Sequence, residues 1–287
     1  MGGRIAVATD TNSGIMYGEA ERLGVSVVSM PFSIDGQECF EGVDLDVERF
    51  YRCQRDGSDI VTSQPSIAAL GKLWKELLQE HDEVVYIPMS SGLSGSCETA
   101  CRLAEHFEGR VFVVDNQRIS VTQRESVLDA LAWVREGRSA AEVRDLLEAD
   151  ALEASIYLMV DTMEHLRRGG RVTPAAAAIG SVLRIKPVLQ IQGSKLDAFS
   201  VAKSERMARR TMLRAIARDV DERFGGSRNV HLYVAHTNCA ETAREFAAEA
   251  GALFGGQDVY VDALPLSIAC HVGAGALGVG CARRRRV

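Results

Sequence analysis

Residues 84–96 read Val-Val-Tyr-Ile-Pro-Met-Ser-Ser-Gly-Leu-Ser-Gly-Ser, and this stretch decides the fold class. A short apolar run ends at Pro88, a loop of serine and glycine follows, and apolar residues then recur at helical spacing from Ala100 to Phe107. A strand, a glycine-containing loop and an amphipathic helix in this order form the unit from which parallel sheets flanked by helices are built.

The same alternation extends through the first half of the chain. Strands are predicted at Arg4–Thr9, Val25–Phe32, Val84–Pro88 and Arg110–Val114, with helices from Ile67 to Leu78, over Ser126–Val134 and over Ala140–Leu147. This order predicts an α/β fold in which helices cover a parallel sheet. Open parallel sheets bind ligands beyond the carboxyl ends of their strands.

The second half predicts a different sheet. Strands are expected at Ile156–Val160, Lys186–Gln192, Leu196–Ala202, Asn229–His236 and Val259–Leu264. Helices are expected at Met163–Arg168, Pro174–Leu183, Ser204–Phe224 and Glu241–Phe254. A glycine-rich apolar segment follows at Val272–Gly280. The turn Gly193-Ser194-Lys195 joins two strands as a hairpin, which indicates a mixed sheet with helices on one face. The 287 residues exceed the usual single-domain size of roughly 100–200 residues, so we expect two domains, 1–150 and 151–287.

The charge of the chain limits its partners. The net charge is −6, and the body of the chain carries no basic stripe, so nucleic acid is not an expected partner. The one basic run, Arg283–Arg286, is interpreted either as a solvated tail or as a transient contact for an acidic partner or an anionic membrane surface.

Other protein classes are excluded by pattern. The sequence has no run of about 18 apolar residues, so no membrane span is predicted, and its first residues contain no signal-peptide core. The seven cysteines are scattered and form no CxxC pair, so no metal site or metal cofactor is expected. These features predict a cytoplasmic protein.

Two turns rich in hydroxyl groups carry the chemistry. The first, Thr62-Ser63-Gln64-Pro65-Ser66, precedes a predicted helix, and the second, Ser90 to Ser96, lies between a predicted strand and a predicted helix. Capping of the helices alone accounts for hydroxyls at such positions. Free backbone N–H groups and the positive end of a helix dipole also suit an oxyanion, either a phosphate or a carboxylate.

The spacing in the second turn argues against three common enzymatic motifs. The Gly-Lys-Ser/Thr ending of a P-loop is missing, and the third glycine of a dinucleotide fingerprint is absent. A nucleophile elbow needs glycine at the position of Ser96. The two turns therefore predict a bound anion without naming it.

The chain resembles the DegV family, fatty-acid-binding proteins that serve bacterial fatty acid kinase. The resemblance covers nearly the whole chain in order, at Thr9–Thr11, Met30–Gly36, Glu41–Asp44, Thr62–Ser66, Ser90–Ser96, Gly169–Val172, Ile185–Leu189 and His271–Gly278. Three positions depart from the family pattern: Ala274 and Ser96 stand where proline and threonine are common, and Glu205 where a basic residue is usual.

The resemblance implies a site for a long-chain fatty acid such as palmitate (hexadecanoate) or oleate. Its carboxylate would lie at the domain interface, bound by Thr62 and Ser94, with Ser63, Gly95 and His271 close by. Its tail would lie in an apolar tunnel of the second domain, for which Leu158, Val160, Ile179, Val182, Leu183 and Leu189 are candidate wall residues.

The same resemblance implies a partner and a role. The protein would present the carboxylate to a separate fatty acid kinase, which would form the acyl phosphate, and would not turn over alone. Arg171, Lys203 and Arg206 are candidates for the surface that contacts this kinase. Glu205, next to this surface, weakens the assignment of the partner more than that of the lipid.

Two alternatives use the same residues. One is a serine esterase in which Ser94 acts with His271 and an aspartate such as Asp10. The other is a module that binds a phosphate-bearing ligand in the Ser90 turn.

Overall fold

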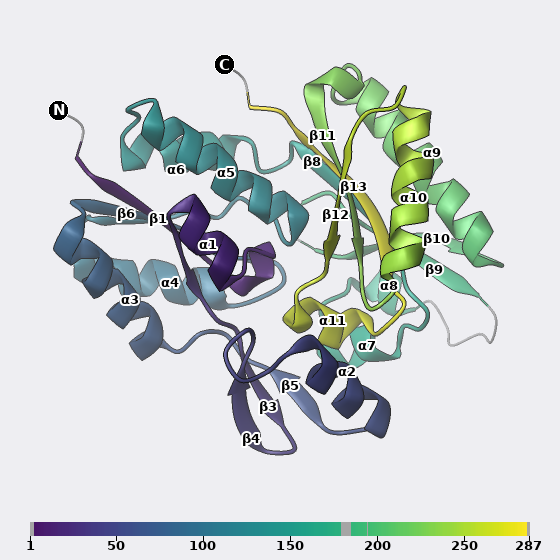
Figure 1. Cartoon of the computed structure of the whole chain (residues 1–287), viewed down its shortest axis with the longest axis horizontal. Helices are drawn as coiled ribbons and strands as arrows, with labels where there is room; N and C mark the ends of the chain where they lie inside the picture. The colour runs from purple at the N-terminus through teal and green to yellow at the C-terminus, as the bar shows by residue number, and fades with distance from the viewer. Residues whose placement is uncertain (1–2, 179–184, 194, 286–287) are drawn as a thin grey trace. The chain divides into compact units, whose positions relative to one another are not determined.

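A computed structural model describes residues 3–178, 185–193 and 195–285 (Figure 1). The chain forms two compact units: unit 1 comprises Met1–Ala151 with Pro265–Ser267, and unit 2 comprises Leu152–Leu264 with Ile268–Val287. The predicted fold class is confirmed, because one unit is built on a parallel sheet and the other on a mixed sheet. No helix within the described ranges combines the length and apolar character that crossing a membrane requires.

The parallel sheet of unit 1 has the strand order β2-β1-β6-β7. Its strands are β2 (Val25–Val28), β1 (Ile5–Asp10), β6 (Glu83–Ile87) and β7 (Val111–Val113). The helices of this unit are α1 (Tyr17–Leu23), α2 (Val47–Asp56), α3 (Ile67–Glu80), α4 (Ser96–Ala104), α5 (Val121–Arg135) and α6 (Ala140–Ala149).

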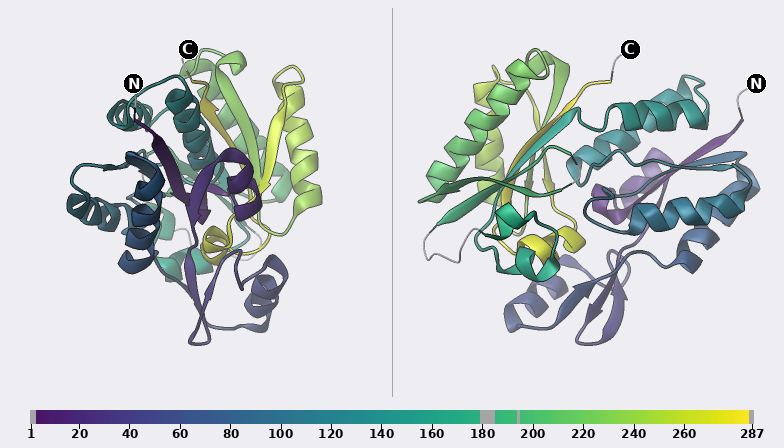
Figure 2. Two further views of the ribbon diagram at one scale, coloured as in Figure 1. Left: turned by 60° about the vertical axis from the view of Figure 1, so that its left-hand side comes forward. Right: turned by 180° about the vertical axis from the view of Figure 1, so that it is seen from behind.

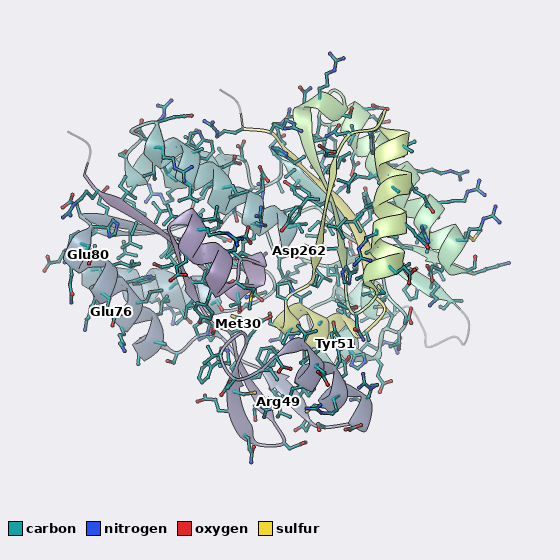
Figure 3. The ribbon with its side chains drawn as sticks, in the orientation of Figure 1. Met30, Arg49, Tyr51, Glu76, Glu80 and Asp262 are labelled. Carbon is teal, nitrogen blue, oxygen red and sulfur yellow. The ribbon has the colours of Figure 1, made fainter. Side chains whose placement is uncertain are left out.

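Each face of this sheet has its own core. Successive side chains of β1 point to opposite faces, so Val7 packs with α5 and α6 while Ala6 and Ala8 pack with α3 and α4. Trp74 is fully buried in the second core. The outer surface of α3 is charged, and Figure 3 shows Glu76 and Glu80 projecting from it.

The prediction of one strand over Val25–Phe32 is wrong. The chain leaves the parallel sheet after Val28 and enters a small antiparallel sheet of order β4-β3-β5, made by β3 (Pro31–Ile34), β4 (Gln37–Phe40) and β5 (Ile60–Thr62). Two local features explain the break. The N–H of Met30 (labelled in Figure 3) donates to Thr11 Oγ1 instead of to a strand, and Pro31 has no N–H to donate.

The mixed sheet of unit 2 has the order β10-β9-β8-β13-β11-β12, in which only β11 and β12 are parallel neighbours among the described strands. The strands are β8 (Ala154–Met159), β9 (Lys186–Ile191), β10 (Asp197–Ala202), β11 (Val230–His236), β12 (Val259–Ala263) and β13 (Leu277–Arg283). Its core lies between this sheet and two long helices, α9 (Glu205–Glu222) and α10 (Ala240–Leu253), which run along the sheet in Figure 2.

The glycine-rich end of the chain forms a central strand, which the sequence did not predict. β13 pairs antiparallel with both β8 and β11. A Cβ added to Gly278 would lie 3.2 Å from Leu158 Cδ1, and one added to Gly280 would lie 3.4 Å from Ile156 Cγ1. The glycines therefore make room for apolar side chains of β8.

Three short helices complete unit 2. They are α7 (Glu164–Gly169), α8 (Pro174–Ala177) and α11 (Leu266–Val272), the last of which begins within the Pro265–Ser267 segment of unit 1. Thr173 caps α8, and Gly170 ends α7 in a left-handed conformation. The predicted helix to Leu183 runs beyond Ala178 into residues 179–184, which lie outside the described residues.

Candidate functional site

The first hydroxyl-rich turn leaves β5 and enters α3. Its cap is Ser66, whose Oγ accepts a hydrogen bond from Ala69 N at 3.1 Å. Ser63 N donates to Pro31 O at 2.9 Å, which fixes the turn against β3. Thr62 is half-buried and Ser63 is exposed. Since Ser66 supplies the cap, capping of α3 does not account for the hydroxyls of Thr62 and Ser63.

The second turn differs from its prediction in one respect. Most of its backbone N–H groups are already used, because Ser90 N donates to Arg118 O at 2.8 Å, and Leu93 N and Ser94 N both donate to Ser90 O. Ser91 N points to Asp115 Oδ1 at 3.4 Å. The expectation that these N–H groups are free is therefore wrong, and the groups that this turn can offer to a ligand are mainly side-chain hydroxyls.

Ser94 and Ser96 form a hydroxyl pair at the start of α4. Their Oγ atoms lie 2.8 Å apart, and Ser94 Oγ also accepts from Ser96 N at 3.1 Å. Ser96 is buried, whereas Ser94 is half-buried. If Ser96 donates within the pair, the hydrogen of the Ser94 hydroxyl can be donated to a ligand.

The two turns lie side by side in unit 1. Gln64 of the first turn donates to Thr99 Oγ1 of α4 at 3.0 Å. A Cβ added to Gly95 of the second turn would lie 3.2 Å from Gln64 Oε1. Gln64 thus connects the turn that carries Thr62 to the turn that carries Ser94, although the sequence did not mark it as a site residue.

A buried carboxylate fixes the start of the second turn. Asp10, at the end of β1, accepts hydrogen bonds from Met89 N at 3.0 Å, from Gln123 Nε2 at 3.1 Å, and from the backbone and side-chain amides of Asn12, both at 3.0 Å. Burial raises the pKa of Asp10 from its usual value, against the lowering effect of these donors. The carboxylate is occupied by amide donors, so Asp10 is poorly suited to be the aspartate of the esterase interpretation.

His271 lies in unit 2, near the end of α11, and its ring packs against a glycine. A Cβ added to Gly169 would lie 2.5 Å from His271 Nδ1. In the same way His165 fills the space beside Gly273, at 2.8 Å. Burial, followed by the charges of Arg171 and His165, lowers the pKa of His271 to about 4. The imidazole is therefore neutral near pH 7 and acts as a hydrogen-bonding group without a charge.

The candidate wall residues lie on β8 and β9 or just after β8. Leu158 and Leu189 are direct cross-strand neighbours, and both are buried. Val160 is also buried, and its N–H donates to Pro187 O at 3.1 Å. These three residues form one apolar group, while Ile179, Val182 and Leu183 lie outside the described residues.

The candidate partner residues are exposed cations of unit 2. Arg171 donates to Gly169 O, so it also supports the glycine against which His271 packs. Lys203 and Arg206 flank the start of α9, where Glu205 stands within 3.6 Å of Arg209. A negative charge in the first turn of a helix interacts favourably with the positive end of the helix dipole. Glu205 therefore stabilises the start of α9 in this chain.

Glu41 was missed as a functional candidate. It is 2% exposed, and its carboxylate accepts from Thr11 Oγ1 at 2.9 Å and from Leu266 N at 2.5 Å. Burial, with a smaller contribution from the charge of Asp10, raises the pKa of Glu41 to about 7. The sequence analysis named Glu41 only within the segment Glu41–Asp44 that resembles the family, and gave it no role in a site.

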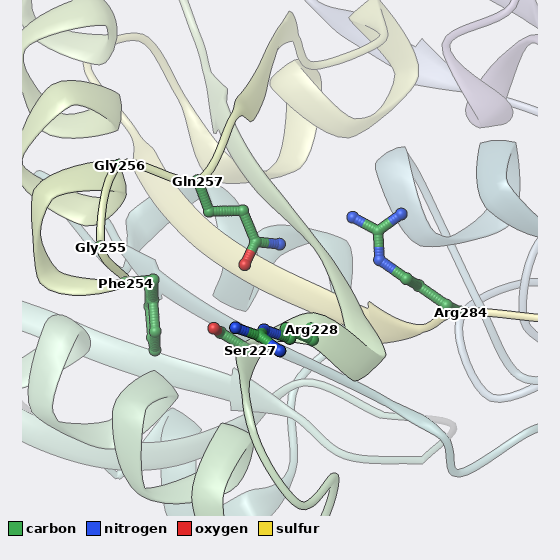
Figure 4. A pocket seen from close by; sticks show the side chains of 7 residues that line it. All are labelled: Ser227, Arg228, Phe254, Gly255, Gly256, Gln257 and Arg284. Carbon is green, nitrogen blue, oxygen red and sulfur yellow. The ribbon is translucent and has the colours of Figure 1, made fainter.

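Other parts of the molecule offer weaker sites. The described residues contain no group of three or more histidine, cysteine, aspartate and glutamate side chains that could hold a metal ion. Unit 2 has an open pocket of about 570 Å³. Figure 4 shows its lining residues, Ser227, Arg228, Phe254, Gly255, Gly256, Gln257 and Arg284. Phe254 is its one large apolar side chain, so this pocket does not suit an acyl tail.

Comparison with known proteins identifies the relatives of the chain. A family model described as "Uncharacterised protein, DegV family" matches residues 4–284. A DegV domain-containing protein of Deinococcus radiodurans is 31% identical over 276 residues, covering 96% of this chain and 97% of the relative.

Solved structures agree with this relationship. A DegV family protein from Thermus thermophilus, described by its fatty acid binding, superimposes with a TM-score of 0.86 at 29% identity, over 98% of this chain and 100% of that one. DegV from Bacillus subtilis, described as a fatty acid binding protein, also gives a TM-score of 0.86, at 27% identity and the same coverage.

Replacing Gly169 with alanine is expected to displace His271. The added methyl would overlap His271 Nδ1, and the backbone at Gly169 does not need a positive φ, so the ring must move. We expect the pKa of His271 to rise from about 4 toward 6.5, which NMR titration of the imidazole measures. The control is Gly18→Ala, where nothing lies within 4 Å. An unchanged pKa in Gly169→Ala would contradict the packing described.

Glu41→Gln is expected to change how stability depends on pH. Folded Glu41 keeps its proton to about pH 7, whereas the unfolded chain loses it near 4.5. The contribution of protonated Glu41 to the free energy of unfolding is fully present below pH 4.5, and it is lost as the pH rises through 7. Relative to wild type, the variant should gain up to about 3 kcal/mol of unfolding free energy between pH 4.5 and 8. Urea denaturation at several pH values measures the unfolding free energy of both proteins. If the two plots of unfolding free energy against pH run parallel, the raised pKa of Glu41 is refuted.

Proposed function

The chain belongs to the DegV family, and on this premise we propose that it binds a long-chain fatty acid by its carboxylate. The observation that carries the proposal is the contact of Gln64 with Thr99 and Gly95, which brings the hydroxyl-rich turns together in unit 1. Thr62 and Ser94 are the proposed donors to the carboxylate, with Ser63, Gly95 and His271 as further head-group residues.

Neutral groups form this proposed head-group site. Hydroxyl groups donate hydrogen bonds without forming an ion pair, and the His271 imidazole is uncharged because its pKa is lowered to about 4. A carboxylate held in this way keeps its negative charge and remains a nucleophile. Such a site suits a protein that presents the carboxylate to another enzyme.

The tail of the fatty acid supplies most of the proposed affinity. Burial contributes roughly 0.8 kcal/mol per CH₂, so a sixteen-carbon chain gains on the order of 10 kcal/mol before the costs of ordering are subtracted. Leu158, Val160 and Leu189 are the described residues proposed to contact it. The head group then fixes the orientation of the ligand more than its affinity.

We propose that a separate kinase phosphorylates the bound carboxylate, and that the chain carries the acyl phosphate without turning over alone. Arg171, Lys203 and Arg206 are exposed and remain the candidate surface for this partner. A cytoplasmic location is part of the same proposal. The phosphoryl group would come from a nucleoside triphosphate bound by the kinase, which would keep the nucleoside diphosphate as the leaving group. No cofactor is proposed for this chain itself.

Ser94→Ala and Thr62→Ala should each weaken fatty acid binding about tenfold or more, because each removes a hydrogen bond to a charged group. Isothermal titration calorimetry of the delipidated protein with oleate measures the affinity. Ser91→Ala is the matched control, since Ser91 lies in the same turn, is exposed, and keeps its backbone hydrogen bond. Wild-type affinity in both variants would refute the head-group assignment.

Native mass spectrometry separates the fatty acid from the alternatives. Protein purified from bacteria should carry a mass of about 250–290 Da, and chromatography of the extracted lipid should identify it as a fatty acid. A phosphate-bearing ligand in its place would favour the phosphate-binding alternative. Turnover of p-nitrophenyl esters that is lost in Ser94→Ala would favour the esterase. Delipidated protein that takes up neither palmitate nor oleate would refute the proposal.

A further inference from the structure

The open pocket of unit 2 lies at one end of the mixed sheet, where three segments far apart in the sequence meet (Figure 4). Arg228 belongs to the 3₁₀ helix Ser227–Asn229 before β11, residues 254–257 connect α10 to β12, and Arg284 follows β13. β13 is antiparallel to β11, and Val230 pairs with Arg283, so the end of one strand lies beside the start of the other. We call this site the arginine pocket.

The two arginines that line the arginine pocket differ from their neighbour Arg283. The guanidinium of Arg283 forms an ion pair with Glu153. In the part of the chain that the structure describes, neither Arg228 nor Arg284 has a carboxylate partner, and none of the residues that line the pocket is acidic. The pocket therefore holds two positive charges that the protein itself does not neutralise, in a chain whose net charge is −6.

Hydrogen bonds within unit 2 hold Arg284 in place without using all of its donors. Val230 O accepts from Arg284 Nε at 3.0 Å and also from Gln257 Nε2 at 2.9 Å, so these two side chains share one acceptor. Arg284 N donates to Asn229 O at 2.8 Å, and its Nη1 lies 3.5 Å from His231 Nε2. A guanidinium has five N–H donors, so Nη2 remains for a ligand.

Two glycines leave the floor of the arginine pocket open. Gly255 and Gly256 have φ angles of 71° and 85°, and a Cβ added to either would meet no atom within 4 Å. Their N–H groups donate to Ala252 O at 3.3 Å and to Gly251 O at 2.8 Å. A ligand can thus approach this loop closely, but side chains must supply the hydrogen bonds.

The donors of the arginine pocket suit a phosphate group. Arg228 and Arg284 offer two guanidinium groups from different segments, and Ser227 adds a hydroxyl. Guanidinium groups form paired, charge-assisted hydrogen bonds with phosphate oxygens, and a phosphate presents more oxygens to several donors than a carboxylate does. The volume of about 570 Å³ is within the range of small-molecule sites, so an ester group can enter with the phosphate.

We propose that the arginine pocket binds the phosphate group of a phosphate ester through Arg228 and Arg284. The ester is either a soluble metabolite or the head group of an anionic lipid, because both present the same chemistry to the pocket. This site shares no residue with the proposed head-group site, so the proposal does not rest on the proposed function.

Calorimetric titration with inorganic phosphate tests the two arginines. Arg228→Gln and Arg284→Gln should each weaken phosphate binding about tenfold or more, because each removes a charge-assisted contact. Arg210→Gln is the matched control: Arg210 is exposed on α9, does not line the pocket, and loses the same charge. Wild-type affinity in both pocket variants, or no saturable binding to wild type, would overturn the proposal.

The hydroxyl-rich turns of unit 1 require their own control, since the Ser90 turn is also a candidate for phosphate. Ser94→Ala should keep the phosphate affinity of wild type if phosphate binds in the arginine pocket. Loss of phosphate binding in Ser94→Ala, with wild-type affinity in Arg228→Gln, would place the phosphate in that turn and overturn the proposal.

Two further measurements test the location and the preference for phosphate. In NMR spectra the amide signals of Gly255 and Gly256 should shift with added phosphate in wild type and in Arg210→Gln, but not in Arg228→Gln. Acetate at the same ionic strength should displace phosphate at least about tenfold less effectively, because it offers fewer oxygens. Signals that do not move, or equal displacement by acetate, would contradict a phosphate site here.

Sedimentation with vesicles distinguishes the two sources of the phosphate. The vesicles consist of phosphatidylcholine with or without phosphatidylglycerol, which is an anionic lipid. Sedimentation that requires phosphatidylglycerol and is lost in Arg228→Gln but not in Arg210→Gln would support a lipid head group. Phosphate binding that depends on Arg228, without such sedimentation, would support a soluble phosphate ester. Arg228→Gln that binds both probes as wild type does would overturn the proposal.

Discussion

The carboxylate of Asp10 is completely buried, and the turn that carries Ser94 begins where this carboxylate accepts a hydrogen bond from Met89 N. A buried charge is strongly unfavourable unless hydrogen bonds replace the water it loses. Asn12 and Gln123 supply the remaining donors, so Asp10 joins the end of β1 to the end of β6 and to α5. The position of the second turn depends on the bond from Met89 N, because losing it would remove a donor from a buried carboxylate.

This internal satisfaction determines what the turn can offer a ligand. The backbone N–H groups of Ser90, Leu93 and Ser94 are occupied inside unit 1. Side-chain hydroxyl groups remain for a ligand in this turn. Such groups donate hydrogen bonds to an anion without neutralising its charge, which is what the proposed function asks of them.

Much of the fold follows from hydrophobic periodicity. The strands of the parallel sheet and the long helices α9 and α10 were predicted because each has a strong repeat and a clear boundary. Two of the failures share a cause: the break between β2 and β3 and the strand β13 both lie where proline or glycine weakens the local strand pattern. β13 contains Gly278 and Gly280, which lower strand propensity, yet neighbours on both sides pair with it and apolar side chains of β8 fill the space beside the glycines.

The sequence by itself determined the two hydroxyl-rich turns, the glycine-rich segment after His271 and the strand–helix alternation that places the Ser90 turn at the end of a strand. These features depend on neighbours along the chain. The tertiary structure decided which groups in those turns are already used, and it made Ser66 the cap of α3. It also brought Glu41 to Leu266, a contact that no local pattern encodes. The residue types determine which groups can donate or accept hydrogen bonds. Which of these groups remain for a ligand depends on the distant donors and acceptors that the fold brings within reach.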